Sequence, residues 1–176
     1  ALSRQWLRCH GHEKAKCATD FERVLASVIK GELMSLLSIA AIQLDAAADG
    51  NLELVEREVR AIAKRFPWVI MVAISELAIN GASLDQAEAA GGPTERRLQA
   101  LARETGMWLI PGSLYERRDD KIYNTTPVID PHGEIIARYD KIFPFLPYES
   151  GVESGTEYVV FDVPGIGRVG IAICYD

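Results

Sequence analysis

Apolar residues follow two spacings along this chain, and the two alternate after Met34. Some are short continuous runs of strand length, whereas others recur every three or four positions, as on one face of a helix. The expected strands are 38–44, 68–75 and 107–115, and the expected helices are 52–66, ended by Pro67, and 95–105, ended by Gly106. The run 68–75 is almost entirely apolar, which is typical of a strand covered on both faces.

The pattern changes after residue 115 to short strands joined by tight turns. Strands are expected at 121–130, 134–140, 157–163 and 168–173, with turns at 117–120, 130–133 and 164–167 and a long loop at 143–155. Strand, helix, strand, helix, strand and then an antiparallel meander predict an α/β fold with a mixed sheet and helices on at least one face. No helix follows the last strand, so we expect part of a domain, truncated at its C-terminus.

Segment 1–33 differs in character from the rest of the chain. It holds two of the three cysteines and two of the three histidines, with no strand-like alternation and one short amphipathic segment at 20–30. We interpret 1–33 as an appended or upstream arm, and 34–176 as the N-terminal portion of the domain. Cys9, His10, His12 and Cys17 do not have the ligand spacing of a zinc site, so no metal site is predicted.

Composition narrows the possible functions. The chain has 176 residues and a formal charge of −6, and 48% of its residues are hydrophobic. That apolar share is enough for a packed core. The negative charge and the lack of a basic stripe argue against a nucleic-acid partner. Lys30 and Glu32 interrupt the longest apolar region, 24–44, which argues against a membrane span. Three cysteines make no disulfide framework, so we expect a reducing, cytoplasmic setting.

Four side chains are candidates for chemistry, and each also has an ordinary structural explanation. Cys174 ends strand 168–173, where α/β sheets present reactive groups, although free cysteine is commonly a core residue. Glu76 follows the run 68–75, so its carboxylate must reach water, a partner or a site. Lys141 lies beside an apolar segment that favours an ion pair or a shifted pKa. Glu149 fits either a site or a surface loop.

Histidine does not offer a base for a cysteine nucleophile. His132 is the one histidine in the main body of the chain, and its place in the turn 130–133 marks it as a turn residue. If Cys174 is a nucleophile, the sequence therefore favours a carboxylate as its base.

These residues, taken in order, carry a family resemblance. Glu76, Lys141 in Arg138-Tyr-Asp-Lys141-Ile-Phe-Pro and Cys174 in Gly170-Ile-Ala-Ile-Cys174-Tyr-Asp176 resemble the Glu–Lys–Cys triad of the nitrilase, or carbon–nitrogen hydrolase, superfamily. The resemblance runs from Met34 to Asp176. Segment 141–151 is more similar to aliphatic amidases and formamidases than to true nitrilases. The resemblance implies part of a four-layer α-β-β-α sandwich that ends just after the nucleophile.

The resemblance also implies a role for each residue. Cys174 attacks the carbonyl or nitrile carbon and forms a thioester-type intermediate, while Glu76 acts as general base and acid. The Lys141 ammonium and the Tyr175 N–H stabilise the oxyanion, and Glu149 positions Lys141 and the substrate. The substrate is a small amide, N-carbamoyl compound or nitrile, no metal or organic cofactor is required, and the full-length protein forms a homo-oligomer.

Three other functions remain open at this point. Residues 1–176 alone are expected to be inactive, because the supporting shell of the site is missing. The first alternative is a pseudo-subunit or interaction module that a partner chain completes, with strand 168–173 as an adhesive edge. A true nitrilase is the second alternative. A glutaminase that supplies ammonia to a fused synthetase is the third.

Overall fold

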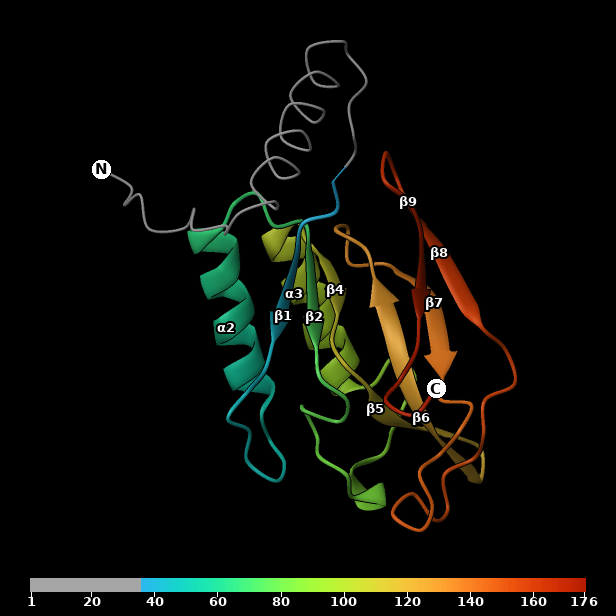
Figure 1. Ribbon diagram of the computed structural model, residues 1–176. Coiled ribbons are helices and arrows are strands. Elements are labelled where there is room, and N and C mark those ends of the chain that lie inside the picture. The colour runs from blue at the N-terminus through green and yellow to red at the C-terminus, as the bar shows by residue number, and fades with distance from the viewer. Residues whose placement is uncertain (1–35) are drawn as a thin grey trace, which may run out of the picture. The chain divides into compact units, whose positions relative to one another are not determined.

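The computed structural model describes residues 36–176, and the expected arm at 1–33, with its cysteines, histidines and amphipathic segment, lies outside the described residues. The described residues form a seven-stranded mixed sheet, a two-stranded sheet and two α-helices (Figure 1). The strands of the large sheet are β1 (Ile39–Ile42), β2 (Met71–Ile74), β3 (Glu88–Ala89), β4 (Trp108–Ile110), β5 (Leu114–Arg118), β6 (Lys121–Ile129) and β7 (Ile135–Asp140).

Strand order brings residues that are distant in sequence to one end of the sheet. β1, β2 and β4 are parallel neighbours, and β4 is antiparallel to β6. Thr125 of β6 pairs with Leu114 of β5 on one side and with Asp140 of β7 on the other. Ile129 of β6 pairs with Leu109 of β4 on one side and with Ile135 of β7 on the other, so β4 and β5 share the edge of β6 opposite β7. β4 and β7 are both antiparallel to β6, so β7 runs in the same direction as β4 and β2. The C-terminal ends of β2 and β7 therefore lie at the same end of the sheet.

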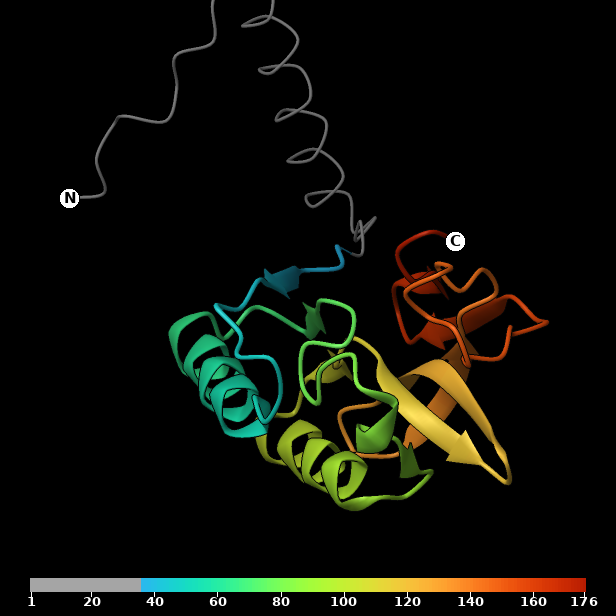
Figure 2. The same cartoon turned by 90° about the horizontal axis from the view of Figure 1, so that it is seen from below.

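Two helices cover one face of this sheet. α2 (Leu52–Arg65) ends just before Pro67, as expected. α3 (Pro93–Thr105) ends at Gly106, whose φ of 67° is the left-handed conformation that glycine adopts at low cost. Asn51 precedes α2, but its side chain bonds to Ala47 and to the Ala78 carbonyl instead of capping the helix. Figure 2 shows both helices on the same side of the strands.

The opposite face packs against a hairpin formed by β8 (Val159–Val163) and β9 (Gly167–Ile171). Neighbouring strand residues divide between the faces: Val72 packs with the helices, whereas Met71 packs with Phe161 of the hairpin. This division explains why the strand sequence is apolar at consecutive positions. Helices, sheet and hairpin are three successive layers of an α/β fold, which confirms the expected fold class.

Some expected elements differ in extent. The strand expected at 107–115 is two strands, because the chain turns at Gly112, with φ of 75°, and β5 pairs with a different part of β6. In the run 68–75 only β2 is strand, and Trp68 is 65% exposed. The short 3-10 helix η1 (Leu84–Gln86) and β3 were not expected from the sequence. Within residues 36–176, none of the helices combines the length and the apolar character needed to cross a bilayer.

Candidate active site

Glu76, Lys141 and Cys174 all lie in segments that follow strands. Glu76 opens the turn after β2, Lys141 directly follows β7, and Cys174 lies in the turn after β9. His132 lies in the turn at the other end of the β6–β7 hairpin, where its N–H donates to Asp130. The structure therefore confirms His132 as a turn residue and places it away from the candidate site.

Lys141 is the centre of a buried ion cluster. Its side chain is 1% exposed, and its Nζ donates to Glu76 Oε1 at 2.7 Å and to Glu149 Oε2 at 2.6 Å. Asn124 of β6 joins the same two carboxylates, because its Nδ2 donates to Glu76 Oε1 at 2.8 Å and to Glu149 Oε1 at 2.7 Å. The backbone N–H of Phe145 also donates to Glu149 Oε2, at 2.6 Å. Lysine and asparagine thus bridge two carboxylates in a closed ring.

The ring keeps its buried charges ionised. Burial by itself lowers the pKa of Lys141, but the hydrogen bonds to Glu149 and Glu76 outweigh burial, and the pKa is raised above its ordinary value. Burial by itself raises the pKa of Glu149, but hydrogen bonds from Lys141, the Phe145 N–H and Asn124 lower the pKa overall. By formal charge, two carboxylates and one ammonium give the cluster one excess negative charge.

Cys174 is exposed and has a φ of 47°, the left-handed region that non-glycine residues seldom occupy. It lines a cavity of about 220 Å³ together with Glu76 and Ser113. The negative charge of Glu76 raises the pKa of the Cys174 thiol and outweighs the opposite influence of Lys141. A thiol in this site needs a base to become a nucleophile.

Local backbone contacts hold the Glu76 turn against the sheet. Leu77, with φ of 50°, donates its N–H to the buried Ser113 Oγ at 3.2 Å. Gly112 lies so close to the Ser75 carbonyl that a Cβ at that position would collide with it. The residues between β4 and β5 therefore help to position the carboxylate that follows β2.

Asp176 links the segments that carry Cys174 and Lys141. Its carboxylate accepts from the Tyr139 hydroxyl at 2.6 Å, from the Phe143 N–H at 2.9 Å and from the Ile173 N–H at 3.2 Å. Tyr139 and Phe143 lie on either side of Lys141 in sequence. One carboxylate therefore links the turn that carries the thiol to the segment that carries the ammonium.

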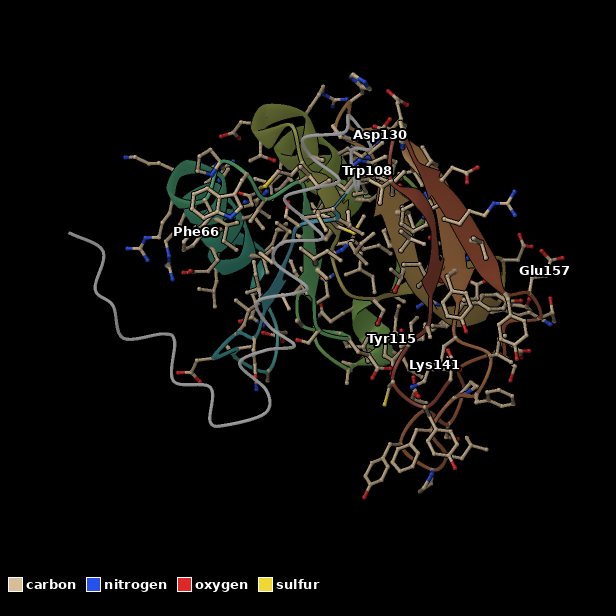
Figure 3. All side chains as sticks on the ribbon, turned by 45° about the horizontal axis from the view of Figure 1, so that its top comes forward. Phe66, Trp108, Tyr115, Asp130, Lys141 and Glu157 are labelled. Carbon is tan, nitrogen blue, oxygen red and sulfur yellow. The ribbon has the colours of Figure 1, made fainter. Side chains whose placement is uncertain are left out.

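Tyr175 faces a second, apolar pocket. Its side chain is exposed and lines, with Phe143, Phe145 and Leu146, a pocket of about 390 Å³. Buried Tyr115 of β5 lies near the ion cluster, and the pKa of its phenol is raised by burial and by the charges of Glu149 and Glu76. Figure 3 shows Tyr115 and Lys141 at the same end of the molecule.

Asn124, Ser113 and Asp176 were not identified from the sequence. For Asn124 a signal was present: Asn124, Thr125 and Thr126 are consecutive polar residues within a strand, and all three are buried. Buried polar groups in a strand need partners, and this need marks such a run as part of a site. Within residues 36–176, no cluster of three or more histidine, cysteine, aspartate or glutamate side chains is arranged to hold a metal ion.

The chain is similar to several known proteins. The human omega-amidase NIT2 is 34% identical over 101 residues, which cover 52% of this chain and 36% of that protein. The crystal structure of Saccharomyces cerevisiae Nit3, a member of branch 10 of the nitrilase superfamily, matches with a TM-score of 0.69 and 25% identity, over 78% of this chain and 55% of that one. A mutant of the amidase from Nesterenkonia sp. AN1 in complex with butyramide matches with a TM-score of 0.69 and 25% identity, over 82% of this chain and 59% of that one.

The chain thus spans 36% of the human protein's length and 55% and 59% of the two solved structures. The family model for carbon–nitrogen hydrolases matches residues 38–176, which include every side chain of the ion cluster and Cys174. This match covers most of the chain and nearly all of the described residues. The chain belongs to the carbon–nitrogen hydrolase family.

Proposed function

We propose that the full-length protein hydrolyses the carbon–nitrogen bond of a small amide or N-carbamoyl compound and releases ammonia, with Glu76, Lys141 and Cys174 as its catalytic residues. The observation that carries this proposal is the pairing of Glu76 and Cys174 in one cavity, with Glu76 held by a buried lysine. The relatives support an amide over a nitrile, since they include omega-amidases and an amidase bound to butyramide.

Acylation begins with a proton transfer. Because the pKa of the Cys174 thiol is raised, Glu76 takes the thiol proton as Sγ attacks the carbonyl carbon. The C=O double bond becomes a C–O single bond, and the oxygen carries the negative charge of the tetrahedral intermediate. When the intermediate collapses, the C–N bond breaks and Glu76 returns its proton to the leaving nitrogen. The products of this half-reaction are ammonia and a thioester on Cys174.

Lys141 supplies charge for the oxyanion. An ammonium has three N–H donors, and Glu76 and Glu149 accept two of them. The third is available to the oxyanion, together with the backbone N–H of Tyr175. Glu149 fixes the ammonium in this orientation and thereby positions it for the substrate.

Deacylation repeats the sequence with water as the nucleophile. Glu76 takes a proton from the water molecule as the water oxygen attacks the thioester carbon. The C–S bond breaks, and the proton returns to Sγ. The products are a carboxylic acid and free Cys174, so the site returns to its starting state with no cofactor consumed.

We also propose that residues 1–176 alone turn over little or no substrate. Cys174 and Tyr175 are exposed in these residues, whereas electrostatic stabilisation of an oxyanion is strongest where water is excluded. The family resemblance further leads us to expect a homo-oligomer of the full-length protein, which light scattering after size exclusion would measure.

The test is ammonia release by the purified full-length protein from butyramide, other short amides, an N-carbamoyl amino acid and the matching nitriles. We expect turnover of an amide, a drop of about 10⁴-fold or more in Cys174→Ala, and an acyl adduct on Cys174 by mass spectrometry. His132→Ala is the matched control and keeps full activity. Ammonia release that persists in Cys174→Ala would contradict the thiol mechanism, turnover of nitriles alone would indicate a nitrilase, and no turnover of either would favour a non-catalytic module.

A further inference from the structure

The Asn124 side chain donates two hydrogen bonds, whereas its carbonyl oxygen accepts none among the described residues. The side chain is fully buried in the middle of β6. Its Nδ2 bonds to two carboxylates, while its Oδ1 is buried without a hydrogen-bond partner among the described residues. An unpaired buried carbonyl is unfavourable, and few such groups occur in folded proteins. The opposite orientation would place Oδ1 against both carboxylates, so the amide has one favourable orientation.

The two hydrogen bonds that Asn124 donates have different effects on the two carboxylates. Glu149 Oε2 accepts from Lys141 and from the Phe145 N–H, whereas Oε1 accepts only from Asn124 among the described residues. On Glu76, Asn124 and Lys141 both bond to Oε1. Glu76 Oε2 is therefore left available for the thiol proton of Cys174, which shares its cavity.

The charges of the cluster favour a neutral hydrogen-bond donor at position 124. Lys141 contributes the single positive charge of the cluster, against the negative charges of Glu76 and Glu149. The other neighbours with ionisable side chains are Cys174 and Tyr115, both of which are neutral when protonated. Asparagine supplies two N–H donors without adding charge, whereas aspartate of the same shape would add a third carboxylate.

We propose that Asn124 is a positioning residue for the proposed reaction, whose amide holds the Glu76 carboxylate in its proton-accepting orientation toward Cys174 and links it to Glu149. This inference rests on the proposed function. Asn124 acts through Glu76 and Glu149 and need not touch the substrate. Its backbone has a separate task, since the Asn124 carbonyl accepts from the Lys141 N–H at 2.9 Å, and a side-chain substitution leaves that bond in place.

The test compares Asn124→Asp with Asn124→Ala in the full-length protein. Asn51→Asp is the matched control, because Asn51 is also buried but bonds to backbone groups beside α2. We expect kcat of Asn124→Asp at neutral pH to fall about 100-fold, with KM changed less than about threefold. The acid limb of its kcat/KM profile moves about one pH unit upward, because a third carboxylate favours a proton bound to the cluster.

Two further results distinguish positioning from simple loss of structure. Asn124→Ala loses kcat without the upward shift, and Asn124→Asp recovers part of its rate at higher pH, which an unfolded variant cannot do. Asn51→Asp is destabilised but keeps the wild-type pH profile. An Asn124→Asp profile that matches wild type, or a loss that only follows the unfolded fraction measured by circular dichroism, would overturn the inference.

Alkylation of Cys174 separates this inference from the proposed function. Iodoacetamide labelling, read at the Cys174 peptide by mass spectrometry, needs no turnover. We expect the labelling curve of Asn124→Asp to lie at higher pH than that of wild type, because added negative charge disfavours the thiolate. A shifted curve in a protein that hydrolyses no amide supports the Asn124 arrangement and contradicts only the activity. An unshifted curve in an active amidase contradicts only the role of Asn124.

Discussion

The Tyr139 hydroxyl donates a 2.6 Å hydrogen bond to Asp176, and this bond joins the end of β7 to the turn that carries Cys174. Tyr139 is fully buried. Burial and the negative charge of Asp176 both raise the pKa of the phenol, so the hydroxyl keeps the proton that it donates. The distance between the Cys174 thiol and the Lys141 ammonium therefore depends on the Tyr139–Asp176 hydrogen bond, in which neither group takes part.

Tyr139→Phe is expected to lower the free energy of unfolding by about 1.5–3 kcal/mol, because a hydrogen bond to a carboxylate is lost. Urea denaturation of the full-length protein measures this change. Tyr158→Phe is the control, since the Tyr158 side chain is exposed. We expect this control to stay within about 0.5 kcal/mol of wild type. Equal effects of the two substitutions would contradict a structural role for the Tyr139–Asp176 bond.

Gly112→Ala tests the packing beneath Glu76. Gly91→Ala is matched to it, because both glycines have positive φ, but an added Cβ at Gly91 meets no atom within 4 Å. We expect Gly91→Ala to cost about 1–2 kcal/mol from backbone conformation alone. Gly112→Ala should cost about 3 kcal/mol or more, since its Cβ also collides with the Ser75 carbonyl. Loss of ammonia release should accompany Gly112→Ala only; similar behaviour of the two would contradict the close approach.

Glu76→Gln is expected to change thiol reactivity and turnover in opposite directions. Removal of the negative charge lowers the pKa of the Cys174 thiol, so the pH midpoint of its alkylation falls by about one unit. Ammonia release falls about 100-fold or more, because glutamine cannot accept the proton. Labelling with iodoacetamide and an ammonia assay on the same preparation measure both. Glu104→Gln, an exposed surface substitution, should change neither, and a midpoint that rises in Glu76→Gln would contradict the charge balance of the site.

Glu149 makes stability depend on pH in the acid range. Its folded-state pKa is lowered. Its contribution is therefore fully present above its unfolded pKa, about 4.3, and is lost as pH falls through the folded value. Urea denaturation from neutral to acid pH should show this loss in wild type and a flatter dependence in Glu149→Gln, which is already destabilised at neutral pH. Glu157→Gln, at an exposed position, should keep the wild-type slope. An unchanged slope in Glu149→Gln would contradict the lowered pKa.

Much of the fold could be predicted from local patterns. The helical spacing of Val55 and Val59 predicted a helix that does bury both residues against the sheet. Gly106 marked the end of α3 because a left-handed residue is favourable there. The division of 107–115 into β4 and β5 was missed, since the chain turns at Gly112, where a close approach to Ser75, distant in sequence, leaves no room for a Cβ.

Hydrophobic spacing was enough to predict both helices and most of the strands, and local sequence singled out Glu76, Lys141, Glu149 and Cys174 as candidates. Each candidate also had an ordinary structural explanation, and the resemblance to the nitrilase superfamily was what grouped the four side chains into one predicted site. The bridge that Asn124 makes between the two carboxylates, and the link that Asp176 makes between Cys174 and Lys141, arise only when the chain folds. The protonation of the thiol also depends on folding, because Coulomb interactions follow the distances that the fold sets between Cys174, Glu76 and Lys141.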